Sequence, residues 1–299
     1  MIIDTHVHLG SKPGYLEELV QMAARLKIDK FCLFTAGSGK PRSGARREAA
    51  GPAGGGSRRP GSTKPKEVER RRTTNEDVLK AHEKYPDVVI PFYYFRLGVD
   101  GPRVVERAHR QGFRGLKLIN PTKNYNDGSY YPVWERCEDL GMVTLFHTGI
   151  VARGPQQVHF DVDSSRMKVI YLDRIARRFQ KMTMFVAHLG NPDHWEAGMM
   201  CRWHANMYFD LSGSTLKYRK AAFFRELLWW GKQKVRYRDE LGRGPWEKIL
   251  FGTDVTPAEM PETVADYRKL FRALRLPREY QDAVMGGTAA RLLGLTVSK

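Results

Sequence analysis

The sequence of 299 residues predicts an α/β fold, a single (β/α)8 TIM barrel. First, apolar runs alternate with segments of helical periodicity along the chain, which is the pattern of repeated βα units. Second, there are eight such runs, and most are apolar throughout, as expected of parallel strands buried on both faces. Third, the chain is long enough to bury the core of one large barrel. We therefore expect residues 1–299 to form one domain.

Each expected element follows from one of these patterns. A short apolar run ending at His6 gives the first strand, residues 2–6, and the next segment places Leu16, Leu19 and Val20 at helical spacing. Further apolar runs give strands at residues 30–35, 88–95, 112–119, 142–147, 182–188, 207–211 and 248–254. Helical patterns give helices at residues 13–26, 75–84, 102–110, 132–140, 169–179, 193–204, 216–230, 261–274 and 277–293.

Residues 38–74 interrupt this alternation. The segment is rich in Gly, Pro, Ser and Arg, and its eleven Lys or Arg against three Glu give a local charge of +8 out of the formal +17. With no apolar run to fold it, we expect a mobile basic insert outside the barrel. Basic segments bind polyanions, but this one has no aromatic residue on which a nucleic-acid base could stack. We do not expect nucleic acid as the main partner; polyanion binding by the insert and a lid over the strand ends remain open alternatives.

Composition points to a cytoplasmic protein. No run reaches the ~18 apolar residues that a membrane span needs. The chain begins inside the expected first strand, so we expect no signal peptide. The three cysteines are widely spaced and form no CxxC pair, which favours free thiols in a reducing compartment. Trp229, Trp230 and Trp246 fit either a homo-oligomer interface or helix packing on the barrel.

Polar side chains stand at the carboxyl ends of several expected strands. His6 and His8 share one face of an extended strand because they are two residues apart. Later strands end similarly, and the whole set is His6, His8, Lys117, His147, His188 and Asp254. TIM-barrel active sites lie at these ends, and closure places the first strand beside the eighth. Imidazoles and a carboxylate suit a divalent cation such as zinc or manganese, so the sequence predicts a metal site that activates water.

Five motifs carry a resemblance to a known family. They are Asp4-Thr-His-Val-His8, Gly115-Leu-Lys-Leu118, Leu145-Phe-His-Thr-Gly149, Ala187-His-Leu-Gly190 and Phe251-Gly-Thr-Asp254. In this order they resemble the amidohydrolase superfamily, and within it the amidohydrolase-related branch. That branch holds small lactonases and hydrolases together with aminocarboxymuconate-semialdehyde and resorcylate-type decarboxylases. The chain departs from the family pattern in reading Gly252-Thr-Asp-Val-Thr-Pro257 for Gly-Thr-Asp-Tyr-Pro, which puts the substrate contacts in doubt.

The resemblance implies a role for each strand-end residue. His6, His8, His147 and Asp254 would be the ligands of one divalent metal, with zinc expected first and manganese second. His188 would be an acid/base or substrate-orienting residue, and Asp254 would also be the candidate base. Lys117 falls where some superfamily members have a carboxylated lysine between two metals. With one metal it would instead be an ammonium for an anionic substrate, so a second metal is expected only if Lys117 is carboxylated.

The first expected function is that of an enzyme, a metal-dependent hydrolase. Metal-bound water would attack an ester, lactone or amide carbonyl of a small, carboxylated substrate while Asp254 takes the proton and His188 assists the leaving group. The alternative is a non-oxidative decarboxylase, a carboxy-lyase of the same family that would use the same residues. Three residues in loops, Arg96, Arg153 and His159, are further candidates for contacting an anionic substrate.

Overall fold

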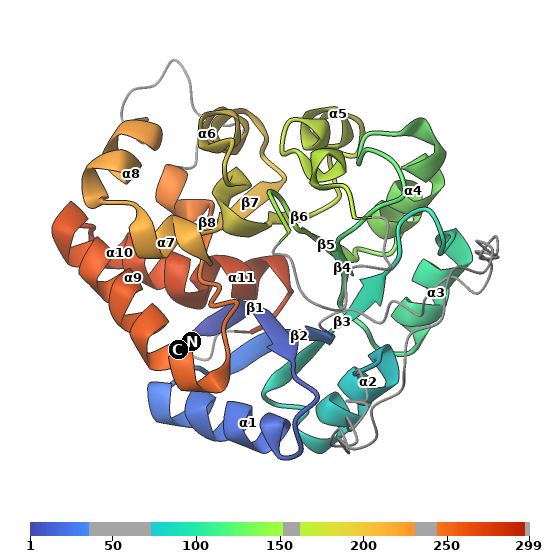
Figure 1. Ribbon diagram of the computed structural model, residues 1–299, viewed down its shortest axis with the longest axis horizontal. Coiled ribbons are helices and arrows are strands. Elements are labelled where there is room, and N and C mark those ends of the chain that lie inside the picture. Colours follow the sequence, from blue (N-terminus) through green and yellow to red (C-terminus); the bar gives the residue numbers. More distant parts are fainter. Residues whose placement is uncertain (36–72, 152–161, 231–243, 297–299) are drawn as a thin grey trace, which may run out of the picture.

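Eight parallel strands form one sheet in which each strand pairs with its neighbour in the sequence. The computed structural model describes residues 1–35, 73–151, 162–230 and 244–296. The strands within them are β1 (Ile3–Leu9), β2 (Lys30–Thr35), β3 (Val89–Phe95), β4 (Gly115–Leu118), β5 (Val143–Phe146), β6 (Met184–Val186), β7 (Met207–Asp210) and β8 (Ile249–Leu250). Thr5 N–H donates to Phe251 O at 2.9 Å and Asp254 N–H donates to His6 O at 2.8 Å, which joins β1 to the end of β8. The predicted (β/α)8 barrel is therefore confirmed (Figure 1).

Helices surround the barrel (Figure 1). They are α1 (Tyr15–Leu26), α2 (Asn75–Lys84), α3 (Pro102–Arg110), α4 (Tyr131–Asp139), α5 (Tyr171–Arg178), α6 (His194–Trp203), α7 (Ser214–Tyr218), α8 (Ala221–Leu227), α9 (Met260–Leu274), α10 (Arg278–Asp282) and α11 (Thr288–Leu292). The helix expected at 277–293 is interrupted at Gly286, whose φ of 167° and ψ of −19° are not helical. A Cβ atom there would lie 2.5 Å from Met1 O, so the position requires glycine. The interruption gives the start of β1 room to pack against this segment.

The core has two layers, and alternate residues of each strand contribute to one or the other. In β2, Cys32 and Phe34 belong to the cluster that fills the barrel, whereas Phe31 and Leu33 belong to the larger cluster between barrel and helices. All four side chains are fully buried. This is why the strands are apolar throughout, as the sequence pattern indicated.

Strand β1 is longer than expected and irregular. It continues through His8 to Leu9 instead of ending at His6, and its pairing with β2 shifts register between Asp4 and Val7. Ile3 packs inside the barrel, but Val7 and Leu9 pack on the helix side, so the alternation changes phase within the strand. The irregularity aims His6 and His8 toward the barrel axis, a use of strand irregularity that is common beside active sites.

The expected basic insert, residues 38–74, lies outside the described residues except for its last two. The Thr73 hydroxyl donates to Leu9 O at 2.9 Å. Thr74 caps α2 by exchanging hydrogen bonds with Asp77, an N-terminal capping arrangement that satisfies the first turn of the helix. The chain therefore re-enters the fold beside the carboxyl end of β1.

The three cysteines and two of the three tryptophans singled out in the sequence occupy buried packing positions. All three cysteines are buried, and none of them forms a disulfide bond with another. Trp230 and Trp246 are buried, which supports the packing alternative for them, whereas Trp229 is 55% exposed. Among the helices of the described ranges, none is both long and apolar enough to cross a membrane.

Candidate metal centre

Three of the predicted ligands meet at the carboxyl end of the barrel. His6, His8 and Asp254 each offer one ligand atom within 4.8 Å of the others. Asp254 Oδ1 lies 3.1 Å from His8 Nε2 and 3.5 Å from His6 Nε2. The backbone of Asp254 is left-handed, with φ of 51°, so the chain turns sharply just after β8 to bring this carboxylate over β1.

Close approach of β8 to β1 depends on Gly252. A Cβ atom at this position would lie 3.1 Å from the Cβ atoms of both His6 and Asp210. The absence of a side chain therefore lets the strand end carrying Asp254 approach the histidines.

The protonation states of these groups suit metal binding. Burial lowers the pKa of His6 to about 4, so the imidazole is neutral near pH 7. Burial raises the pKa of Asp254, but attraction by His6 and His8 outweighs it and holds that pKa well below its usual range. Neutral imidazole and ionised carboxylate are the forms that bind a metal cation.

The fourth predicted ligand, His147, lies next to this group but outside it. Its Nδ1 atom is 3.3 Å from His188 Nε2, and its Nε2 atom is buried with no hydrogen-bond partner among the described residues. Burial lowers the pKa of His147 well below its ordinary value, so this ring is also neutral. A buried ring nitrogen without such a partner fits a metal ligand, since buried polar atoms otherwise have partners.

His188 completes the cluster. It follows β6 in a left-handed conformation, with φ of 61°, and its ring is 5.3 Å from that of His6 and 5.0 Å from that of His147. His188 Nε2 lies 3.8 Å from Asp254 Oδ2. The ring therefore stands beside the carboxylate, where the predicted acid/base residue is required.

Lys117 approaches the same place from β4. Its Nζ atom is 2.9 Å from His6 Nε2 and 4.7 Å from the centre of the Phe34 ring. Burial lowers the pKa of Lys117 to about 8, although Asp254 and Asp210 act in the opposite direction. The amine thus lies against the nitrogen of His6 that faces the predicted metal position.

Sequence reasoning did not assign a role to Asp210 or Ser212. Asp210 ends β7, and its Oδ2 is 2.8 Å from His6 Nδ1. Ser212 Oγ lies 2.5 Å from Asp210 Oδ1 and 2.9 Å from His188 Nδ1. A carboxylate that ends an apolar run is the same signal that identified Asp254, so it could have been found in the sequence.

Of the three loop candidates for substrate binding, Arg96 belongs to the described residues, and its side chain bonds a residue outside this cluster. Arg96 is paired with Asp100, with one guanidinium nitrogen 2.7 Å from Asp100 Oδ1, and its side chain is 48% exposed. Arg153 and His159 lie outside the described residues.

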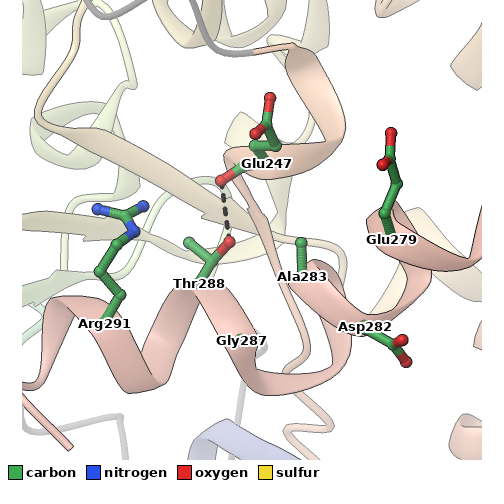
Figure 2. A pocket seen from close by; sticks show the side chains of 7 residues that line it. All are labelled: Glu247, Glu279, Asp282, Ala283, Gly287, Thr288 and Arg291. Carbon is green, nitrogen blue, oxygen red and sulfur yellow. Dashed lines mark hydrogen bonds between the residues drawn. The ribbon is translucent and has the colours of Figure 1, made fainter. Parts of the chain in front are cut away.

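A hollow of about 570 Å³ lies elsewhere, near the amino end of β8 (Figure 2). Its lining is Glu247, Glu279, Asp282, Ala283, Gly287, Thr288 and Arg291. The Thr288 hydroxyl donates to Glu247 O at 3.0 Å, and Glu247 comes just before β8. This hollow is therefore at the opposite end from the histidine cluster, and TIM-barrel active sites lie at the carboxyl ends of the strands.

The fold and the group of His6, His8 and Asp254 define a class, TIM-barrel proteins that can hold a metal ion at the carboxyl end of the barrel. Within this class the chain belongs to the amidohydrolase family, whose model, described as Amidohydrolase, matches residues 3–295. The resemblance inferred from the five motifs is therefore confirmed. No curated protein shows a significant sequence match to the chain.

Solved structures share the fold at low sequence identity. An uncharacterised TIM-barrel protein from Bordetella bronchiseptica has a TM-score of 0.65 and 16% identity, with 98% of both chains covered. A 5-carboxyvanillate decarboxylase from Sphingomonas paucimobilis has a TM-score of 0.61 and 15% identity, with 99% of both chains covered. A probable 2-pyrone-4,6-dicarboxylic acid hydrolase from Acinetobacter baumannii has a TM-score of 0.57 and 14% identity, covering 98% of this chain and 99% of that one.

Proposed function

We propose that this chain is a metal-dependent hydrolase that cleaves an ester, lactone or amide bond of a small carboxylated substrate. The observation that carries the proposal is the group of His6, His8 and Asp254, with ligand atoms within 4.8 Å of one another at the carboxyl end of the barrel. Membership of the amidohydrolase family supports it.

The metal would be held by His6, His8 and Asp254, with His147 as the fourth ligand through its unpartnered Nε2 atom. We propose zinc, with manganese as the second choice, because two or three imidazoles with a carboxylate are typical of catalytic zinc. When bound, the cation supplies Lewis acidity and lowers the pKa of a water molecule to ~7.

The protein's own groups would move the protons. Asp254 is ionised, and its Oδ2 atom is 3.8 Å from His188 Nε2. The carboxylate can therefore take a proton from the attacking water, and His188 lies where it can receive that proton and deliver it to the leaving group. The Lys117 amine, buried beside His6, would attract an anionic substrate toward the site.

A non-oxidative decarboxylase is the second candidate. The observation that favours it is the position of Lys117, whose amine faces the same centre as His188 and could hold a substrate carboxylate next to a proton donor. The 5-carboxyvanillate decarboxylase and the probable 2-pyrone-4,6-dicarboxylic acid hydrolase share this fold and are named for carboxylated substrates. We therefore propose a carboxylated substrate for either reaction.

Metal analysis tests the proposed site. The purified chain should carry about one metal ion, and the variant His6→Ala/His8→Ala should carry almost none after the same purification without added metal. His109→Ala, which changes an exposed histidine of α3, is the matched control and should retain the metal. Wild-type protein that neither contains nor takes up zinc or manganese would contradict the proposal. About two ions per chain would instead favour a carboxylated Lys117.

A substrate panel separates the two reactions. Aromatic and pyrone carboxylates would be incubated with the metal-loaded enzyme, and carbon dioxide release would be measured beside ring opening or ester cleavage. Hydrolysis without carbon dioxide supports the hydrolase. Carbon dioxide release without carbonyl cleavage would contradict the hydrolase and support the decarboxylase.

A further inference from the structure

Asp210 is the residue that connects the two key imidazoles. It ends β7, is 1% exposed, and places its two carboxylate oxygens against different partners. Oδ2 lies 2.8 Å from His6 Nδ1. Oδ1 accepts hydrogen bonds from the Ser212 hydroxyl at 2.5 Å, from Ser212 N–H at 3.0 Å and from His188 N–H at 2.9 Å. One buried carboxylate is thus bonded to the ring of His6 and to the backbone of His188.

The contact with His6 determines which ring nitrogen carries the proton. Oδ1 of Asp210 accepts from three donors at once, which favours the ionised form of the carboxylate. An ionised carboxylate only accepts hydrogen bonds. The Lys117 amine, 2.9 Å from His6 Nε2, donates to that nitrogen, so Nε2 keeps a lone pair and the ring N–H is at Nδ1, beside Asp210 Oδ2. That Nε2 atom faces Lys117 Nζ and Asp254.

The same argument extends to His188 through Ser212. The Ser212 hydroxyl must donate its proton to Asp210 Oδ1, so its oxygen accepts from His188 Nδ1 at 2.9 Å. The carbonyl oxygen of Ser212, which can only accept, lies 3.3 Å from the same nitrogen. Both neighbours therefore require an N–H at His188 Nδ1. In the neutral ring, Nε2 is then unprotonated, and it faces His147 Nδ1 and Asp254 Oδ2.

We propose that Asp210 is a positioning residue that fixes the proton of His6 directly, and of His188 through Ser212, at Nδ1. Both rings then present an unprotonated Nε2 atom to the centre. The proposal rests on the proposed metal site and goes beyond it by naming the residue that orients the site. His147 follows the same order, because donation from its Nδ1 to His188 Nε2 leaves its own Nε2 without a proton in the neutral ring.

The substitution Asp210→Asn tests the inference because it keeps the shape and removes one acceptor. The three donors at Oδ1 require the amide oxygen there, which turns the amide N–H₂ toward His6 Nδ1. His6 should then carry its proton at Nε2, the nitrogen that must be bare to bind a metal. We expect the affinity for Zn²⁺ to fall ~10- to 100-fold, the range seen for lost partners of ligating histidines.

Two variants serve as controls. Asp173→Asn removes the carboxylate that lies 2.8 Å from Nε2 of another buried histidine, His204. It should leave Zn²⁺ affinity unchanged. Ser212→Ala keeps the contact between Asp210 and His6, so its Zn²⁺ affinity should stay within ~3-fold of wild type, while the hydroxyl acceptor of His188 is lost.

The readouts are ¹⁵N NMR of the histidine rings in the full-length, metal-free chain and titration with Zn²⁺ against a competing chelator. The proposal is supported if His6 and His188 of the wild type are protonated at Nδ1. It also requires that Asp210→Asn has His6 protonated at Nε2 and binds Zn²⁺ more weakly. Either ring protonated at Nε2 in the wild type would overturn it, even if the variant does not fold. A folded Asp210→Asn variant in which the protonation of the histidine rings and the Zn²⁺ affinity match the wild type would also overturn the proposal. If the wild type shows the expected ring protons but does not bind Zn²⁺, the proposed metal-dependent function is wrong. The role of Asp210 in fixing the ring protons is then decided by the NMR spectra alone.

Discussion

The carboxylate of Asp4 accepts hydrogen bonds from both donors of Thr253, although 249 positions separate the two residues. The Thr253 hydroxyl lies 2.6 Å from Asp4 Oδ2, and the Thr253 N–H lies 3.0 Å from Asp4 Oδ1. Oδ1 also accepts from the N–H of His6 at 3.1 Å. The two bonds from Thr253 connect β1 to the segment after β8, next to two of the proposed metal ligands.

Replacing Thr253 by Val should destabilise the protein by about 1–3 kcal/mol. Valine has the same shape, but the fully buried Asp4 carboxylate loses its hydroxyl partner, and an unpaired buried acceptor is costly. Urea denaturation measures the free energy of unfolding. Thr253→Ser retains the hydroxyl and should recover most of the loss; a valine variant as stable as wild type would show that this bond does not hold the barrel closed.

Adding a methyl group at Gly252 should damage both stability and metal binding. The new Cβ of Gly252→Ala would lie 3.1 Å from the Cβ atoms of His6 and Asp210, so one strand must move. Overpacking of this kind costs about 1–3 kcal/mol. Gly128→Ala is the matched control, because its Cβ would meet only the Tyr131 ring at 4.0 Å. Thermal unfolding and zinc content of both variants give the comparison, and equal effects would argue against a special role for Gly252.

The stability of the fold should decrease below about pH 6.5 in part because of His194. This residue of α6 is buried, its Nδ1 bonds Leu189 O at 2.9 Å, and its Nε2 has no partner. Burial lowers the pKa of His194. The unfolded chain therefore binds a proton at higher pH than the folded chain, and stability falls as pH falls through the unfolded value.

The comparison of wild type with His194→Gln tests this pH dependence. Free energies of unfolding at about pH 7.5 and about pH 5.5 should differ less in the variant, because the titrating group is gone. His109→Gln, at an exposed position of α3, should keep the wild-type difference. An unchanged difference in His194→Gln would assign the acid sensitivity to other groups.

Substituting Lys117 by Met should leave the metal content at about one ion per chain if the site is mononuclear. Met is apolar and similar in length, so the variant should be as stable as wild type or more stable, since removing a buried charge is often stabilising. Weaker binding of carboxylated substrates, seen as a raised KM with little change in kcat, would fit an ammonium that attracts anions. A fall from two metal ions to one would instead identify a bridging, carboxylated lysine.

Local pattern predicted much of the fold. The bounds expected for the second strand and for the helices at 75–84 and 102–110 match β2, α2 and α3. Expected strands were too long at 182–188 and 248–254, where only Met184–Val186 and Ile249–Leu250 are paired. The residues left outside these strands include His188 and Asp254, which adopt left-handed backbone conformations that no apolar pattern indicates.

The sequence by itself determined the alternation of strands and helices, the polar residues at the strand ends and the family motifs, because these depend on neighbours a few positions apart. Only the tertiary structure decided that Asp210 contacts His6 and that Thr253 contacts Asp4. Residues far apart in the chain meet at distances of about 3 Å only when the barrel closes. Whether two candidate residues form a hydrogen bond depends on distances of this size, and the spacing of residues along the sequence does not indicate those distances.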